Sequence, residues 1–141
     1  MQLQFDIEGG NFSQAGTASS EVKKILKQIN IDPKILKRIV ICLYEAEVNV
    51  VAHAYHGTIS VDINSNRIEM VLTDSGPGIP DIEKAMQLGF STASPEVREM
   101  GFGAGMGLPN IKNNSDRLDI RSQVGIGTTV KITVFFQADQ E

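Results

Sequence analysis

Two pairs of short alternating segments constrain the fold of this 141-residue chain most strongly. Apolar and polar side chains alternate in residues 58–63 and 67–73, and again in residues 118–124 and 128–136. A period of two predicts strands with one buried face, and a few asparagine, serine or glycine residues between two such strands predict a β-hairpin. Because hairpins join antiparallel strands, we expect a mostly antiparallel sheet.

The remaining segments predict one more strand and four helices. Residues 1–7 alternate like a strand with one buried face. Helices are expected over residues 17–30, 33–55, 81–88 and 108–117, where apolar side chains recur at three or four residues or turn signals precede the segment. Asp32 and Pro33 are typical of an N-cap and of the first helical position, so they mark the start of the longest helix.

This order of elements predicts the fold class α+β. We expect a two-layer α/β sandwich with a mixed, mostly antiparallel sheet that carries helices on one face. The length fits one domain, and the chain contains neither an internal repeat nor a linker, so residues 1–141 are interpreted as a single domain.

The composition excludes several classes of function. The net charge is -4 and the basic residues are scattered, so no direct nucleic-acid partner is expected. No segment is apolar enough to cross a membrane and none resembles a signal peptide, so we expect a cytoplasmic protein. Cys42 is the only cysteine and cannot form an intramolecular disulfide; its apolar neighbours predict a buried packing residue.

Four segments carry residues that could do chemistry. Glu45 and Asn49 are four residues apart on the longest predicted helix and therefore share a face, which His53 extends. The loop of residues 74–80 follows a strand, and the glycine-rich residues 101–107 precede a helix. The fourth segment, Gly127-Thr128-Thr129, opens the last strand. Each segment alone has a plainer interpretation, as a solvated helix face, a turn or a surface loop.

Glycines before a helix indicate a phosphate site, because bare backbone N–H groups and the positive end of the helix dipole attract phosphate oxygens. The usual nucleotide motifs are absent. The chain has no P-loop string, its glycine spacing is G-x-G-x-G-x-G after a loop rather than G-x-G-x-x-G after a strand, and the signature set of eukaryotic-type kinases is missing.

Taken together, the four segments resemble the Bergerat ATP-binding fold. The motifs E-x-x-x-N on a helix, D-x-G-x-G after a strand, a glycine run before a helix and G-T at the last strand occur in the order typical of that superfamily. Its members include sensor histidine kinases, type II topoisomerases and anti-sigma-factor kinases. The resemblance covers nearly the whole chain and implies that the ligands are ATP and Mg²⁺.

The resemblance also implies a role for each motif residue. Asn49 would coordinate Mg²⁺, Asp74 would accept a hydrogen bond from the adenine amino group, and Thr128 would support Asp74. Glu45 lies where the superfamily has its general base, which takes the proton from an incoming hydroxyl of serine, threonine or water. The glycines expected to surround the base and the phosphates are Gly76, Gly78, Gly103, Gly105 and Gly107.

Within the superfamily, this short chain resembles the anti-sigma-factor serine kinases and the related stress-pathway switch kinases. That branch implies a serine or threonine on a STAS-domain antagonist protein as the substrate, and a sigma factor as a further candidate partner. Homodimers are common among such proteins. Two alternatives stay open. One is a module that binds its partner in an ATP-gated way without important phosphotransfer, and the other is the detached ATP domain of a two-component histidine kinase.

Position 47 and the segment of residues 93–100 depart from the pattern, and Arg98 in that segment has two interpretations. Position 47, inside the E-x-x-x-N segment, is Glu where a small or apolar residue is more usual, and we expect it to face solvent. Residues 93–100 lengthen the loop that would act as a lid over the phosphates, and we expect that loop to be mobile. Arg98 in this loop is interpreted as a solvated residue, with contact to the γ-phosphate as the alternative.

Overall fold

The computed structural model describes residues 1–53, 56–87 and 107–137. Five strands form one sheet: β1 (Gln2–Glu8), β2 (His56–Ile63), β3 (Arg67–Ser75), β4 (Arg117–Gln123) and β5 (Gly127–Phe135). They lie in the order β1-β2-β3-β5-β4, and each neighbouring pair is antiparallel. Both predicted hairpins are present, as β2–β3 and β4–β5. Strand β5 therefore lies between β3 and β4, which leaves β1 and β4 at the edges of the sheet.

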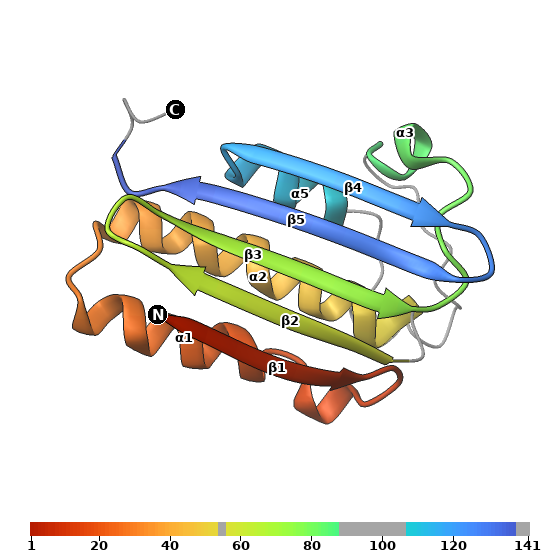
Figure 1. Cartoon of the computed structure of the whole chain (residues 1–141), viewed down its shortest axis with the longest axis horizontal. Helices are drawn as coiled ribbons and strands as arrows, with labels where there is room; N and C mark the ends of the chain where they lie inside the picture. Colours follow the sequence, from red (N-terminus) through yellow and green to blue (C-terminus); the bar gives the residue numbers. More distant parts are fainter. Residues whose placement is uncertain (54–55, 88–106, 138–141) are drawn as a thin grey trace.

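The helices cover one face of this sheet. They are α1 (Thr17–Gln28), α2 (Pro33–His53) and α5 (Gly107–Asn114), with a short 3-10 helix, η1 (Phe12–Gln14), after β1 and a single turn, α3 (Ile82–Ala85), after β3. Figure 1 shows α1, α2 and α5 on the same side of the sheet, with α2 under its middle strands. Helix α2 packs against α1, α5 and four of the strands. The α+β class and the two-layer arrangement predicted from the sequence are confirmed.

Helix α2 begins where the sequence predicts. The Oδ1 atom of Asp32 accepts a hydrogen bond of 2.8 Å from the backbone N–H of Lys34, and Pro33 is the first helical residue. This capping bond satisfies one of the backbone donors that the first turn of a helix leaves unpaired.

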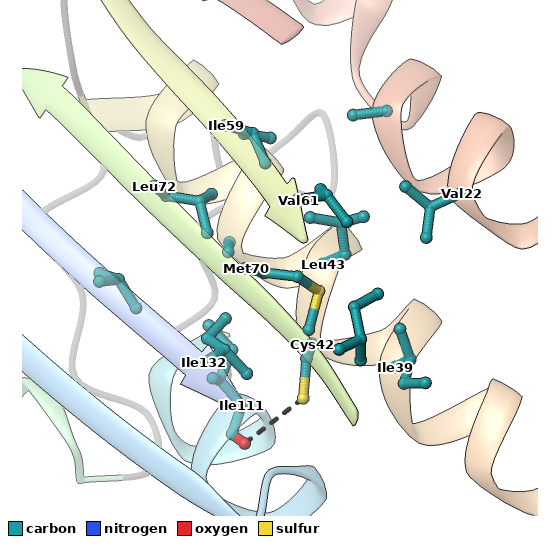
Figure 2. Close-up of a cluster of buried hydrophobic side chains, with 14 of the residues drawn as sticks. Val22, Ile39, Cys42, Leu43, Ile59, Val61, Met70, Leu72, Ile111 and Ile132 are labelled. Atoms are coloured by element: carbon teal, nitrogen blue, oxygen red, sulfur yellow. Dashed lines mark hydrogen bonds between the residues drawn. The ribbon is translucent and has the colours of Figure 1, made fainter. Parts of the chain in front are cut away.

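The core lies between the sheet and the three helices. Figure 2 shows side chains from α1, α2, α5 and the strands meeting there, among them Val22, Leu43, Met70, Ile111 and Ile132. Burial of each large apolar side chain contributes about 1.5 to 3 kcal/mol. Cys42 belongs to this cluster, so its prediction as a buried packing residue is confirmed. Burial raises the pKa of its thiol to about 12, and the thiol donates a weak 3.6 Å hydrogen bond to the carbonyl oxygen of Ile111.

Two predicted helices are longer than the observed ones. The helix expected over residues 81–88 is only the single turn α3, capped by Asp81. The helix expected over residues 108–117 ends at Asn114, and Arg117 opens β4 instead. Asp116 explains this early end. One of its carboxylate oxygens accepts a 2.7 Å hydrogen bond from the backbone N–H of Phe135, and the other accepts 2.9 Å from the Arg38 guanidinium, so the chain turns into the sheet.

Candidate functional site

Two residues of the predicted site lie on α2. Glu45 and Asn49 are both half-buried and one helical turn apart, next to the buried residues Ala46 and Val50 that face the sheet. This face of α2 is therefore only partly covered, as expected for the wall of a cleft. His53 is the last residue of the same helix.

Glu45 lies at the beginning of α5. A Cβ atom placed on Gly107, the first residue of α5, would be 3.4 Å from Oε2 of Glu45, so the carboxylate packs directly against this backbone. Burial raises the pKa of Glu45, and a hydrogen bond with the side chain of Asn110 opposes that rise. A carboxyl group with a raised pKa is better matched to proton transfer near neutral pH than an exposed one.

Asp74 lies near the end of β3 on the helix-covered face of the sheet. Its cross-strand partners are Gly57 on β2 and Thr128 on β5. The Oδ1 atom of Asp74 accepts a 3.2 Å hydrogen bond from the backbone N–H of Thr128. Burial raises the pKa of the Asp74 carboxyl, and this hydrogen bond opposes the rise. The carboxylate is thus held by β5 while it remains partly accessible.

Gly57 brings the start of β2, beside Asp74, close to α2. A Cβ atom at this position would lie 2.7 Å from Cγ1 of Val50 and 3.5 Å from Cβ of Asp74. Only a residue without a side chain fits this space, so Gly57 lies between Asp74 and Val50, the residue that follows Asn49 on α2. In Figure 1, the last turns of α2 lie behind the sheet at the end of β3, and α2 contacts both β2 and β3. The structure therefore brings the two separated sequence segments together.

The loop after Asp74 is joined to the tip of the β4–β5 hairpin. The N–H of Gly76 donates to the carbonyl of Ile126 at 3.3 Å, and the N–H of Gly125 donates to the carbonyl of Pro77 at 2.9 Å. Gly78 has a φ of +78°, and a Cβ there would come within 2.6 Å of the carbonyl oxygen of Gln123. Gly78 thus lets the loop and the hairpin pack backbone to backbone.

Gly127 is the glycine of the predicted G-T motif and also lies at the end of the hairpin turn before β5. Its φ is +155°, and a Cβ atom would collide with the carbonyl oxygen of Asp74. Its close approach puts the next residue, Thr128, directly opposite Asp74. The G-T pair therefore fixes how β5 meets the end of β3.

Ser122 on β4 is a site residue that the sequence analysis missed. Its Oγ accepts a 2.7 Å hydrogen bond from the backbone N–H of Ile79 and lies 2.9 Å from the Thr128 hydroxyl. It also lies 3.2 Å from the carbonyl oxygen of Gly127, to which it can donate. The signal was its place in the alternation of β4, where Leu118, Ile120 and Ser122 share the inward face.

The side chain of Glu47 is buried, so the prediction that it faces solvent is wrong. It is 2% exposed, and its carboxylate accepts hydrogen bonds from the backbone N–H groups of Ala18 at 3.1 Å and Ser19 at 3.3 Å. Gly16, the N-cap of α1, has no side chain with which to cap the helix. Glu47 supplies that cap from α2, because a carboxylate both accepts from the free donors and complements the helix dipole.

A pocket of about 540 Å³ reaches Glu47 from between β1 and the start of α1. The residues that line it are Gln4, Phe5, Asp6, Ile7, Glu8, Asn11, Gln14, Thr17, Ala18 and Glu47. None of these belongs to the predicted nucleotide site, so the two regions are distinct.

Three predicted positions fall outside the described residues, namely Gly103, Gly105 and Arg98, and so does the expected lid loop. Within residues 1–53, 56–87 and 107–137, no group of three or more His, Cys, Asp or Glu side chains is placed to hold a metal ion. Mg²⁺ bound with nucleotide needs only one or two protein ligands, because phosphates and water complete its shell, and a single amide such as Asn49 fits this pattern. No helix in the described ranges is long and apolar enough to cross a membrane.

These elements define an α+β nucleotide-binding fold of the Bergerat type. The chain belongs to the histidine kinase-like ATPase domain family, whose sequence model matches residues 11–134. This membership supports ATP binding.

Two named relatives indicate the branch. An anti-sigma F factor from a Thermoanaerobacter species is 33% identical in an alignment of 145 positions that covers 99% of this chain and 96% of that protein. The serine/threonine-protein kinase RsbT of Bacillus subtilis is 30% identical over 113 residues, which cover 77% of this chain and 79% of that protein.

Solved structures share the fold at lower identity. The RsbU and RsbW domains of a Mycobacterium tuberculosis protein match with a TM-score of 0.64 and 16% identity, over 95% of this chain and 32% of that longer one. The SiaB-SiaC complex of Pseudomonas aeruginosa contains a chain that matches with a TM-score of 0.58 and 12% identity, over 94% of this chain and 89% of that one.

Proposed function

We propose that this protein is an ATP-dependent serine/threonine protein kinase of the anti-sigma-factor type, with a STAS-domain antagonist protein as its substrate. The observation that carries the proposal is the placement of Glu45. Its half-buried carboxylate lies against Gly107 at the beginning of α5, one turn of α2 away from Asn49. A binding module needs Asn49 and Asp74 but has no use for a base at this place.

The base of ATP would be held at the end of the sheet. Asp74 accepts a hydrogen bond from the amino group of adenine, while the backbone N–H of Thr128 donates to Asp74 and holds it in place. Gly76 and Gly78 let the loop backbone bend around the base. These assignments are supported by the partial burial of Asp74 and by the contacts that join its loop to the β4–β5 hairpin.

The phosphates would extend from there toward α5. The N–H groups at the start of α5 and the positive end of its dipole favour phosphate oxygens, with Gly103, Gly105 and Gly107 as the proposed surroundings. Asn49 would hold Mg²⁺, which neutralises phosphate charge when it is bound. Glu45 takes the proton of the substrate hydroxyl while the hydroxyl oxygen forms a bond to the γ-phosphorus. The bond from the γ-phosphorus to the oxygen that bridges it to the β-phosphate breaks, and ADP leaves.

A second function is favoured by the names of the relatives, because anti-sigma F factor appears among them more often than kinase. In this alternative, ATP gates the binding of a sigma factor or another regulator, and phosphotransfer is unimportant. A homodimer and a single domain over residues 1–141 fit both functions.

Transfer of label from γ-labelled ATP to the partner separates the possibilities. Acid-stable label on serine or threonine supports the kinase. Acid-labile label indicates phosphohistidine and a two-component kinase, and ATP-dependent binding without label supports the gated binder.

A further inference from the structure

Ser122 joins three parts of the proposed adenine-binding site through one hydroxyl group. Its hydroxyl oxygen accepts a 2.7 Å hydrogen bond from the backbone N–H of Ile79, in the loop after Asp74. It lies 2.9 Å from the hydroxyl of Thr128 and 3.2 Å from the carbonyl oxygen of Gly127, both on β5. Ser122 itself lies on the edge strand β4, which contains none of the site residues predicted from the sequence.

The hydrogen atoms in this cluster can be assigned by counting donors and acceptors. A serine hydroxyl has one proton to donate, and it accepts through its lone pairs. The carbonyl of Gly127 can only accept, and the N–H of Ile79 can only donate. All four groups are satisfied when Ser122 donates to Gly127 and the Thr128 hydroxyl donates to Ser122. In this arrangement Thr128 has used its proton, and its oxygen is left with lone pairs alone.

The same arrangement sets what a nucleobase meets beside Asp74. The Oδ1 atom of Asp74 is occupied by the N–H of Thr128. Within the described parts of the chain, no hydrogen bond is made to Oδ2, so that oxygen is free to accept. Two acceptors, Oδ2 of Asp74 and the Thr128 hydroxyl oxygen, then stand on neighbouring strands. An exocyclic amino group offers two N–H donors to such a pair, whereas a carbonyl oxygen would face lone pairs and be left unpaired.

We propose that Ser122 is a specificity-determining positioning residue: without touching the base, its hydroxyl fixes the Thr128 hydroxyl as an acceptor beside Asp74 and so makes the site select a purine with a 6-amino group over one with a 6-carbonyl group. This inference rests on the proposed function in one respect, that the base binds at Asp74. It does not depend on phosphotransfer.

The competing explanation is that Ser122 only braces the loop. In that case its loss would weaken every nucleotide to the same extent, because the loop surrounds the base whatever its 6-substituent. Base selectivity therefore separates the two explanations, and affinity for ATP alone does not.

The experiment compares ATP with inosine triphosphate, whose base has a 6-carbonyl group and an N1–H where adenine has a 6-amino group and an unprotonated N1, on the full chain with Mg²⁺ by calorimetry. The variants are Ser122→Ala, Ser122→Thr, which keeps the hydroxyl, and Ser60→Ala, which removes an exposed hydroxyl from β2 as a matched control. We expect Ser122→Ala to reduce the ATP preference about 10-fold, the effect of one hydrogen bond, while the other two variants keep the preference of the original protein.

An unchanged ratio of the two affinities in Ser122→Ala would overturn the inference. If both nucleotides bind more weakly by the same factor, Ser122 only braces the loop. If circular dichroism shows that Ser122→Ala does not fold, Ser122→Cys takes its place, because a thiol is of similar shape but a weaker hydrogen-bonding group. A protein that selects ATP but transfers no phosphate would contradict the kinase proposal and leave this inference standing. A protein that transfers phosphate equally well from both nucleotides would do the reverse.

Discussion

The carboxylate of Glu45 on α2 lies against Gly107, the residue with which α5 begins, at 3.4 Å from the position of a Cβ atom there. The two residues are 62 apart in sequence. The contact joins the proposed general base, Glu45, to the helix whose N-terminus would bind the phosphates. Burial and the hydrogen bond with Asn110 act on the pKa of this carboxylate in opposite directions, since burial favours the neutral acid and the hydrogen bond favours the anion.

Replacing Glu45 by glutamine should abolish transfer while ATP still binds. The amide keeps the shape of the side chain but cannot accept the substrate proton, and loss of a general base costs about 10²- to 10⁴-fold in rate. The measurement is the rate of partner phosphorylation beside the affinity for ATP. Glu21→Gln, at an exposed position of α1, is the matched control and should transfer at the normal rate.

The transfer rate should rise with pH through a pKa above the usual glutamate range. Burial raises the pKa of Glu45, and only the ionised form can take a proton, so activity is low below that pKa and reaches a plateau above it. The pH profile of kcat/KM measures this. A rate that is already constant at the pKa of an exposed glutamate would show that Glu45 is not the group that titrates.

Asp74→Asn should weaken ATP about 10- to 100-fold and yet raise the melting temperature of the nucleotide-free protein. The loss in affinity reflects one hydrogen bond to a charged acceptor. Stability changes in the other direction because the pKa of Asp74 is raised in the fold. The contribution of its neutral form is complete below the unfolded pKa and is lost as pH rises through the folded pKa.

Thermal melts of the original protein and of Asp74→Asn therefore check the sign. The difference in melting temperature should be larger near neutral pH than in acid, where Asp74 is already protonated. A variant that melts lower at neutral pH would contradict the inference that burial disfavours the ionised carboxylate.

Glu47→Ala should destabilise the protein by about 2 kcal/mol or more, because it leaves the N–H groups of Ala18 and Ser19 without their acceptor in a buried place. Glu47→Gln keeps one carbonyl oxygen and should cost less than Glu47→Ala. Chemical denaturation measures both. Free energies of unfolding equal to that of the original protein would mean that the cap at α1 contributes nothing.

Gly127→Ala should cost about 3 kcal/mol or more, since the added Cβ collides with the Asp74 backbone at a φ of +155°. The neighbouring Gly125→Ala is the comparison: its φ is +82°, but a Cβ there would meet nothing within 4 Å. It should therefore lose only the smaller cost of its backbone conformation. Equal losses for the two variants would show that the close approach to Asp74 is not what requires glycine.

The sequence predicts this fold well where periodicity and turn chemistry agree. The β2–β3 and β4–β5 hairpins and the start of α2 at Pro33 follow from local signals that act within a few residues. The end of α5 does not, because Asp116 is drawn into contacts with Arg38 and Phe135, which are distant in sequence.

The candidate site shows the same division. The positions of Glu45, Asn49 and Asp74 are visible as motifs, but the roles of Glu47 and Ser122 depend on partners that only the folded chain supplies. A charged residue on a helix is usually solvated, so Glu47 could not be predicted from the sequence as a buried cap of α1. A serine in a strand gives no sign that a loop 43 residues away donates to it.

The most direct measurement of the central claim is incubation of the protein with γ-labelled ATP, Mg²⁺ and the STAS-domain protein encoded nearest its gene, with Glu45→Gln run in parallel. The kinase proposal predicts acid-stable label on a serine or threonine of the partner, and almost none with the variant. Tight ATP binding without any transfer to this partner, or transfer that is undiminished by Glu45→Gln, would contradict it.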